Sequence, residues 1–288
     1  MINFIDNIFN EDVIHLLKKL PDNSIDMIYS DPDYNVGIKY NNNTYTQKFE
    51  NYIEWYAFLA KESLRVLKDT GNMFFINYPK QNSYLWVKYL DKACYDVHEY
   101  VWIYNTNVGH SPKKFTTAHR TILHCTKTKN NQWFKNSVAE EYLNPNDKRI
   151  KQNILNGSKG RMPYSWLYYN LVKNVSKDKT MHSCQIPVGL TEKLLKASTK
   201  ENDIALIHFG GSGNEILLVK QLKRHYISAE IDPVYYNMIL ERIKNNGIIP
   251  QEYRLKFKKE KINKDDLHEV SSELSEDLFN LKRNYLNL

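Results

Sequence analysis

The chain has 288 residues, 42% of them hydrophobic, which suffices for one large domain or for a domain that carries a lobe. Its formal net charge of +7 suits a polyanionic partner, although proteins that never bind nucleic acid often carry a similar charge. The separated residues Cys94, Cys125 and Cys184 disfavour a disulfide framework or a metal site, and the absence of a leader or long apolar run favours a cytoplasmic protein without a membrane partner.

The first half of the chain predicts several strands and one long helix. Residues 24–30 are expected to form a strand that ends at Asp31-Pro32, where Pro and Asn residues begin a loop. Apolar residues recur at helical spacing from Tyr52 to Leu67, and Gly71 is expected to close this unit. Further strands are expected at residues 72–78, 97–104 and 121–126.

Residues 128–180 lose this periodicity and carry ten Lys or Arg against four acidic residues, with aromatic residues between them. Basic side chains that hold phosphates and aromatic rings that stack on bases indicate a recognition lobe. A packed surface insertion with solvated lysines is the alternative. The candidate DNA-binding residues in and near this segment are Lys113, Lys114, Lys148, Arg149, Lys151, Lys159 and Arg161.

The second half predicts a regular alternation of helices and strands. This order is typical of a parallel, doubly wound α/β sheet, whose ligands bind beyond the carboxyl ends of the strands. Asp232 and Pro233 suit the cap and first position of the last helix. The expected elements are a helix at 187–199, a strand at 203–209, a glycine turn at 210–213, a helix at 214–223, a strand at 225–229 and a helix to about Lys244.

Two parts of unequal size are therefore expected. Residues 1–250 form the predicted catalytic domain, including the 128–180 insertion, and residues 251–288 form a tail that begins basic. The tail then places Leu267, Val270, Leu274, Leu278 and Leu281 on one face of a potential helix. This face is expected to pack on the body or on a second subunit, which would make a homodimer.

The glycine turn and the acid after the next strand suggest a nucleoside cofactor. Gly211, Ser212 and Gly213 follow a predicted strand and allow the backbone to approach a ligand, while Glu230 can accept hydrogen bonds from a ribose. A tight turn without a ligand explains the glycines equally well. The spacing G-x-G-x-x-G is absent, which argues against NAD.

The segment Asp31-Pro32-Asp33-Tyr34-Asn35 follows a predicted strand and suits methylation of an amino group. The Asp31 carboxylate and the Pro32 carbonyl can accept the two N–H groups of an adenine amine and aim its lone pair at a methylsulfonium. A base inside a duplex must be flipped out to reach this loop, and Tyr34 is expected to stack on it. An ordinary Asp-Pro turn is the alternative interpretation.

Together these segments resemble the β group of DNA amino-methyltransferases, whose members show Asp-Pro-Pro-Tyr-Asn after a leader similar to residues 16–26. The segment His182-Ser183-Cys184-Gln185-Ile186-Pro187 resembles a second family element, His-Pro-x-Gln-Lys-Pro, beside the methionine part of the cofactor. The resemblance implies a Rossmann-like methyltransferase fold, S-adenosylmethionine without a metal, duplex DNA and an accompanying restriction endonuclease. It also implies cofactor contacts for Asp12, Asp31, His182, Gln185, Phe209, Gly211, Ser212, Gly213 and Glu230.

Several residues depart from the family pattern. Asp33 replaces the second Pro, Glu11 replaces a Gly, and Asn214-Glu215 replaces Thr-Thr; Ile207-His208 stands where the family has Asp-Pro. A DNA-binding homologue with little activity therefore stays open, as do RNA or protein substrates and methylation of cytosine N4. The opening Asp of the loop favours adenine. Methylation of cytosine C5 is disfavoured because none of the three cysteines follows a Pro.

Overall fold

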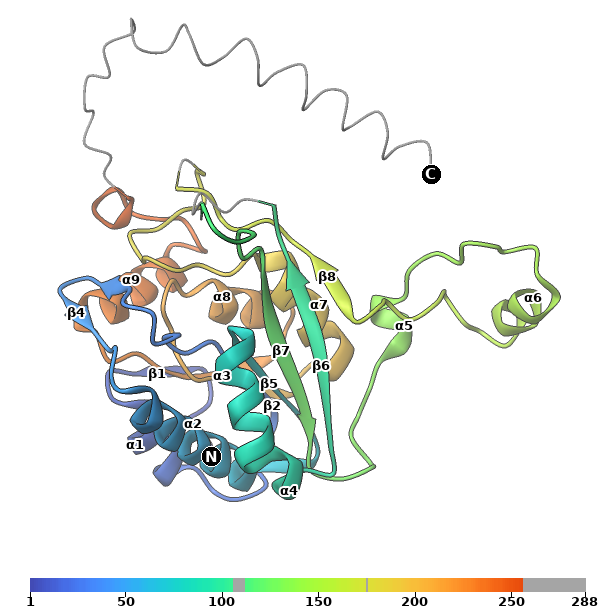
Figure 1. Cartoon of the computed structure of the whole chain (residues 1–288), viewed down its shortest axis with the longest axis horizontal. Helices are drawn as coiled ribbons and strands as arrows, with labels where there is room; N and C mark the ends of the chain where they lie inside the picture. Colours follow the sequence, from blue (N-terminus) through green and yellow to red (C-terminus); the bar gives the residue numbers. More distant parts are fainter. Residues whose placement is uncertain (106–111, 175, 256–288) are drawn as a thin grey trace, which may run out of the picture. The chain divides into compact units, whose positions relative to one another are not determined.

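The computed structural model describes residues 1–105, 112–174 and 176–255, so the predicted tail helix lies outside the described residues. Residues 1–255 form one compact unit around an eight-stranded sheet (Figure 1). The strand order is β1-β10-β9-β2-β5-β7-β6-β8, and each strand runs parallel to its neighbours except β7, which is antiparallel to β5 and β6. The strands are β1 (Asn7–Phe9), β2 (Ile25–Ser30), β5 (Leu67–Asn77), β6 (Asp96–Ile103), β7 (His119–Thr126), β8 (Trp166–Tyr168), β9 (Ile204–Ile207) and β10 (His225–Ala229).

Helices cover both faces of this sheet, which confirms the predicted doubly wound α/β class (Figure 1). One face is covered by α1 (Val13–Lys19), α2 (Phe49–Val66), α3 (Pro79–Leu85), a π-helical turn (Trp86–Leu90) and α4 (Asp91–Ala93). The other is covered by α7 (Val188–Ser198), α8 (Asn214–Gln221) and α9 (Pro233–Lys244). A short hairpin, β3 (Lys39–Tyr40) and β4 (Asn43–Thr44), lies apart from the sheet. Within the described residues, no helix is long and apolar enough to cross a membrane.

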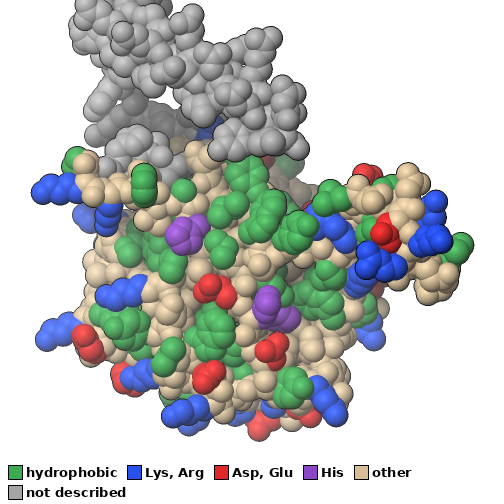
Figure 2. Space-filling view, turned by 45° about the vertical axis from the view of Figure 1, so that its right-hand side comes forward, with side chains coloured by type: hydrophobic (Ala, Val, Ile, Leu, Met, Phe, Trp, Pro, Cys, Tyr) green, Lys and Arg blue, Asp and Glu red, His purple; other side chains and the backbone are tan. Residues whose placement is uncertain are grey.

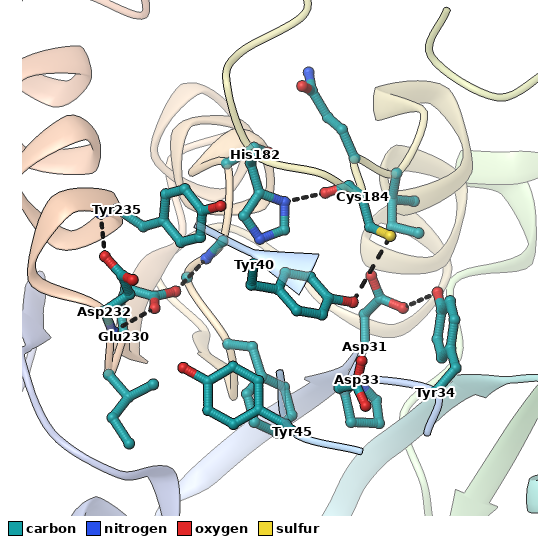
Figure 3. Close-up of a pocket in the computed structure, with 18 of the residues that line it drawn as sticks. Asp31, Asp33, Tyr34, Tyr40, Tyr45, His182, Cys184, Glu230, Asp232 and Tyr235 are labelled. Atoms are coloured by element: carbon teal, nitrogen blue, oxygen red, sulfur yellow. Dashed lines mark hydrogen bonds between the residues drawn. The ribbon is translucent and has the colours of Figure 1, made fainter. Parts of the chain in front are cut away.

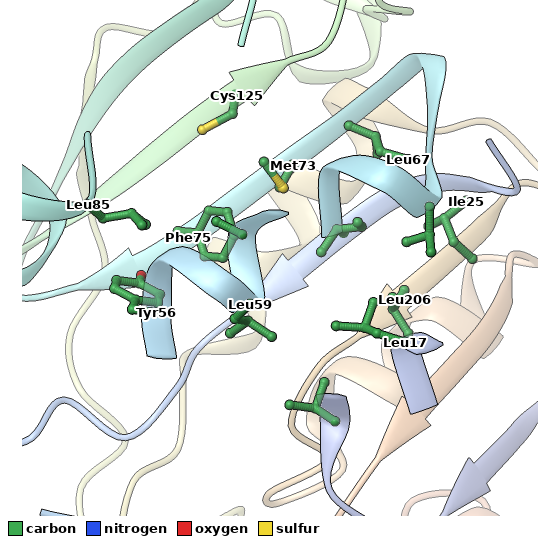
Figure 4. Close-up of a cluster of buried hydrophobic side chains, with 14 of the residues drawn as sticks. Leu17, Ile25, Tyr56, Leu59, Leu67, Met73, Phe75, Leu85, Cys125 and Leu206 are labelled. Atoms are coloured by element: carbon green, nitrogen blue, oxygen red, sulfur yellow. The ribbon is translucent and has the colours of Figure 1, made fainter. Parts of the chain in front are cut away.

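The alternation of side chains along the central strands divides the core into two layers. On β5, Met73 and Phe75 belong to the cluster under α1 and α2, whereas Phe74 and Ile76 face the layer under α7 and α8. Figure 4 shows the first cluster, in which Phe75 is fully buried. Both faces of the central strands are therefore apolar, as parallel sheets with helices on each side require.

One predicted boundary is wrong for a physical reason. The expected strand at 72–78 begins at Leu67, because β5 pairs with β2 at Ile25↔Leu67 and again at Met27↔Asn72, with a bulge between the two pairs. Gly71 therefore lies inside β5 and closes no unit. A β-carbon at this position would meet the Leu67 side chain at 2.6 Å. The bulge explains why a glycine stands here, because the extra residues of β5 bring the backbone at Gly71 close to the Leu67 side chain.

Part of the segment 128–180 belongs to the sheet. Strand β8 pairs with β6, and its Leu167 is buried in the core. What projects in Figure 1 is the stretch with α6 (Lys148–Leu155), joined to the body beside α5 (Lys135–Val138). An antiparallel bridge between Glu140 and Arg161 closes the base of this projection, which we call the α6 lobe and define as residues 140–161.

Candidate functional site

A cavity of about 250 Å³ lies at the carboxyl ends of β2, β9 and β10. Asp31 follows β2 and lies at one end, whereas Glu230 follows β10 and lies at the other (Figure 3). Pro32, the next residue after Asp31, also lines the cavity. His182, Tyr40 and Tyr45 lie between these ends in the same view. The strand topology thus brings together residues that are about two hundred positions apart in the sequence, in the place where parallel α/β sheets bind ligands.

The glycine turn after β9 is fixed by Glu230. Its carboxylate accepts the backbone N–H groups of Gly211 at 2.8 Å and Asp232 at 2.9 Å. Gly211 and Gly213 have φ values of 53° and 78°, a backbone region that favours glycine. Gly211 and Ser212 line the cavity with Gly210, whereas Gly213 lies outside the lining and caps α8. Burial raises the pKa of Glu230 to about 7.

Asp12 and Phe209, two further predicted cofactor residues, also line the cavity. The Asp12 side chain accepts a hydrogen bond from the Ile14 N–H at 2.7 Å and so caps α1. Phe209 packs against Trp55 of α2, with 6.3 Å between ring centroids. Both residues therefore have a structural role besides their place in the cavity wall.

Neighbouring side chains clamp the loop after β2. The Tyr52 hydroxyl donates to the Asp33 carbonyl at 2.7 Å, and the Gln81 amide donates to the Tyr34 carbonyl at the same distance. Within the described part of the chain, the Pro32 carbonyl accepts no hydrogen bond. An acceptor is thus left open beside the Asp31 carboxylate in the cavity wall.

The Asp31 carboxylate is half-buried and weakly stabilised as an anion. Burial raises its pKa to about 6, against the opposing effects of the Tyr34 hydroxyl, which donates to it, and of Arg120. The guanidinium of Arg120, from β7, lies over the Tyr34 ring at 4.5 Å. The Tyr34 hydroxyl orients the Asp31 carboxylate through this hydrogen bond. Because Tyr34 is only 1% exposed, neither face of its ring is open for a base to stack on.

Sequence reasoning missed Arg120, which is buried among aromatic rings. Besides Tyr34, its guanidinium lies 5.1 Å from the Trp102 ring and 5.5 Å from the Tyr78 ring. Such cation–π contacts compensate for its burial. No local motif could have revealed this residue, because β7 reaches the loop only through the sheet.

Asp33, which replaces the family's Pro, also lines the cavity. One carboxylate oxygen accepts the Asn35 N–H at 2.9 Å, and the other is buried without a hydrogen bond in the described residues. Burial raises the Asp33 pKa, and its charge in turn raises the pKa of Asp31. The substitution thus places a second carboxylate beside the first.

The segment of His182 and Gln185 borders the middle of the cavity. Burial lowers the pKa of His182 to about 4, so the ring is neutral at pH 7, and its Nδ1 lies at the Cys184 carbonyl. The Gln185 amide donates to the Asp178 carbonyl at 2.7 Å and accepts the Thr180 N–H at 3.2 Å. Gln185 therefore shapes this loop, and both ends of its amide are already used.

The charge of the cavity wall has one sign. Six acidic residues line it, and among its described lining residues there is no Lys or Arg. With His182 neutral, the wall favours a cation over an anion. Within residues 1–105, 112–174 and 176–255, no group of three or more His, Cys, Asp or Glu side chains could hold a metal ion. The acidic lining residues are Asp12, Asp31, Asp33, Glu215, Glu230 and Asp232.

The predicted DNA-binding residues differ in their surroundings. Lys148, Arg149 and Lys151 are exposed on α6, and Figure 2 shows Lys and Arg side chains gathered on this projection. Arg161 instead forms an ion pair with Glu140 at 2.8 Å at the base of the α6 lobe and lies 4.3 Å from the Tyr164 ring. Glu140 also pairs with Lys193 at 2.7 Å, so Arg161 shares this carboxylate with a second cation and is partly neutralised within the protein. Lys113, Lys114 and Lys159 are exposed outside α6.

Comparisons with known proteins bear on this site. A family profile described as DNA methylase matches residues 25–241. The chain is 29% identical over 248 residues to the type II methyltransferase M.BglII of Bacillus subtilis, covering 81% of this chain and 68% of that protein. It is 30% identical over 249 residues to M.HpaI of Haemophilus parainfluenzae, with 84% and 76% covered. The DNA adenine methyltransferase YhdJ of Escherichia coli is 25% identical, with 94% of each chain covered.

Two solved structures share the fold. The cytosine-N4-specific PvuII DNA methyltransferase aligns with a TM-score of 0.61 at 16% identity, covering 84% of this chain and 90% of that one. The M1.HpyAVI–SAM complex aligns with a TM-score of 0.57 at 21% identity, covering 82% and 98%. With the family match over most of the chain and the loop after β2 at the cavity, the chain belongs to the N6-adenine/N4-cytosine family of DNA methyltransferases.

Proposed function

We propose that the protein transfers a methyl group from S-adenosylmethionine to N6 of an adenine that is flipped out of duplex DNA. The proposal rests on one continuous cavity. Glu230, which can accept hydrogen bonds from a ribose, lies at one end, and Asp31 lies at the other (Figure 3). Asp31 and the neighbouring Pro32 carbonyl can accept the two N–H groups of the target amine. A cofactor held at the first end can reach a base held at the second. The residues of the two ends come from separate strands that the sheet brings together.

The cavity wall fits a sulfonium cofactor. S-adenosylmethionine carries a net positive charge, which six acidic residues and no Lys or Arg in the described lining would favour, whereas a dinucleotide diphosphate would be repelled. We assign the ribose to Glu230 and the adenine ring to the side of Phe209. When bound, the cofactor supplies an electrophilic methyl group on sulfur. M1.HpyAVI, which shares the fold, forms a complex with this cofactor.

The loop after β2 would prepare the target amine. Asp31 and the Pro32 carbonyl accept its two N–H groups, which draws the nitrogen towards a tetrahedral shape and directs its lone pair at the methyl group. Asp31 must be ionised to do this, and at pH 7 it largely is, because its pKa is about 6. Stacking of the base on Tyr34 requires the wall beside Arg120 to open, since the ring is buried.

Adenine is favoured over cytosine because the loop opens with Asp31, and because YhdJ, similar along nearly its whole length, is named as an adenine enzyme. Cytosine N4 is the second candidate, since the PvuII enzyme with the same fold is cytosine-N4-specific. The exposed basic residues of α6 are the proposed contact to the DNA backbone. A restriction endonuclease for the same sequence is the expected partner.

The test uses purified protein, labelled S-adenosylmethionine and three substrates that carry the same set of random sequences: duplex DNA, single-stranded DNA and RNA. The proposal predicts N6-methyladenine in nucleosides from the duplex, with much less product from RNA. Label in cytosine would replace the proposed target by the second candidate. Cofactor binding without transfer to any duplex of random sequence would support the inactive homologue instead.

A further inference from the structure

Glu215 lies in the first turn of α8, directly after the glycine turn, and its side chain lines the cavity. It is 7% exposed. No other described residue donates a hydrogen bond to its carboxylate, and only its own backbone N–H faces it. The other five acids of the cavity each accept a hydrogen bond from another residue: Asp12 from Ile14, Asp31 from Tyr34, Asp33 from Asn35, Glu230 from Gly211 and Asp232 from Val234.

The Glu215 carboxylate faces the cavity with little exposure to solvent, and a carboxylate in such a place is stabilised when a group donates hydrogen bonds to it. Burial and the nearby Asp31 raise the Glu215 pKa to about 8. Tyr29 is a neutral neighbour, since its own pKa is raised well above 10. Arg242 is the nearby cation, but its guanidinium donates to the Ser212 carbonyl and to the Asn214 side chain. The Glu215 oxygens therefore remain available to a ligand.

The chemistry of the cofactor indicates which of its groups this ligand is. The ribose hydroxyl groups are assigned to Glu230, and the cofactor's own carboxylate would be repelled. The sulfonium carries a positive charge but has no N–H or O–H to donate. The α-ammonium group of the methionine part offers three N–H donors and a charge of opposite sign, which is the partner that a buried carboxylate needs.

We propose that Glu215 binds the α-ammonium group of the cofactor's methionine part. The inference rests on the proposed cofactor and assigns a residue that departs from the family pattern, in which a neutral Thr occupies this position. The pair would be a charge-assisted contact, and because the pKa of Glu215 in the free protein is about 8, its formation at pH 7 would release the carboxyl proton to solvent. Because S-adenosylhomocysteine keeps the ammonium group and lacks only the transferred methyl group with its sulfonium charge, Glu215 would hold the product as well as the substrate.

The test is calorimetric binding of three ligands to the full chain: S-adenosylmethionine, S-adenosylhomocysteine and an analogue of the latter in which hydrogen replaces the α-amino group. Glu215→Gln should weaken binding of S-adenosylhomocysteine by roughly 10- to 100-fold and leave the affinity for the analogue almost unchanged. Glu215→Thr should give the same pattern, so the test does not depend on one folded variant. Glu201→Gln, which removes an exposed acid paired with Lys223, is the matched control and should bind all three ligands like the wild type.

Equal loss of affinity for S-adenosylhomocysteine and its analogue would overturn the inference, because Glu215 would then support only the shape of the cavity. Weaker binding of S-adenosylmethionine together with unchanged binding of S-adenosylhomocysteine would also overturn it, since the carboxylate would then serve the sulfonium. These results are distinct from a failure of the proposed function, in which the wild-type protein itself would bind neither S-adenosylmethionine nor S-adenosylhomocysteine.

Discussion

Replacing Arg120 should change the pH at which the enzyme gains its activity. Arg120→Met removes a cation whose charge lowers the pKa of Asp31 and keeps an apolar side chain of similar length among the rings. The pKa of Asp31 should therefore rise above its value of about 6. Because transfer requires the carboxylate, activity is lost as pH falls through this pKa, and the variant should lose it at a higher pH.

The size of the effect follows from the fraction of ionised Asp31. With a pKa of about 6, the wild type has about half of its plateau rate at pH 6 and about 90% at pH 7. Arg120→Met should fall below half at pH 6. Asp33→Asn removes a charge that raises the Asp31 pKa, so this variant should stay above half at pH 6. The two substitutions thus shift the profile in opposite directions.

The assay is initial-rate methyl transfer between pH 5 and 9, with cofactor and DNA well below their KM values, because the pH profile under these conditions reports the pKa of the free enzyme. Loss of the cation–π contacts should also destabilise Arg120→Met by about 2 kcal/mol. The thermal unfolding of the variant is therefore measured first, and the assay is run at a temperature at which it is folded. Profiles that coincide for the wild type and both variants would refute the reasoning, because Asp31 would then not control the rate through its ionisation.

Three further predictions concern the cofactor, the DNA and the core. Glu230→Gln should weaken S-adenosylhomocysteine binding by roughly 10- to 100-fold in calorimetry, because one amide oxygen replaces a carboxylate that holds two N–H groups; unchanged affinity would mean that the ribose binds elsewhere. Lys148→Ala combined with Lys151→Ala should reduce the magnitude of the slope of log DNA affinity against log salt concentration by about 2. Lys92→Ala on α4 is the control and should leave this slope unchanged. Equal slopes in all three proteins would mean that the α6 lobe is a surface insertion without DNA contacts. Phe75→Ala should lower the free energy of unfolding in urea by about 3–5 kcal/mol, far more than Phe58→Ala, whose side chain is 40% exposed; similar losses would contradict the described core.

Local signals were sufficient to predict some elements. β10 begins and ends as expected, because its apolar run is bounded by turn residues, and α9 begins at Pro233 with Asp232 as its cap. The order of strands and helices predicted a ligand site beyond the carboxyl ends of the strands, and the family resemblance implied cofactor contacts for Asp31 and Glu230. The structure places both in the wall of the same cavity.

Other features depend on contacts that no local pattern encodes. The early start of β5 follows from a bulge against β2, and β8 joins the sheet although its sequence gives little periodicity. The clamps on the loop after β2 come from Tyr52 and Gln81, which lie on other elements of the chain. The ion pair of Arg161 with Glu140 likewise appears only when the two ends of the α6 lobe meet.

The most direct test of the proposed transfer compares two strains of a bacterial host without DNA methyltransferases of its own. One expresses the wild-type chain and the other Asp31→Ala, and nucleosides of their genomic DNA are analysed by mass spectrometry. The proposal predicts N6-methyladenine with the wild type and none with Asp31→Ala, although the purified variant still binds duplex DNA. N6-methyladenine at similar levels in both strains, or N4-methylcytosine with the wild type, would contradict it.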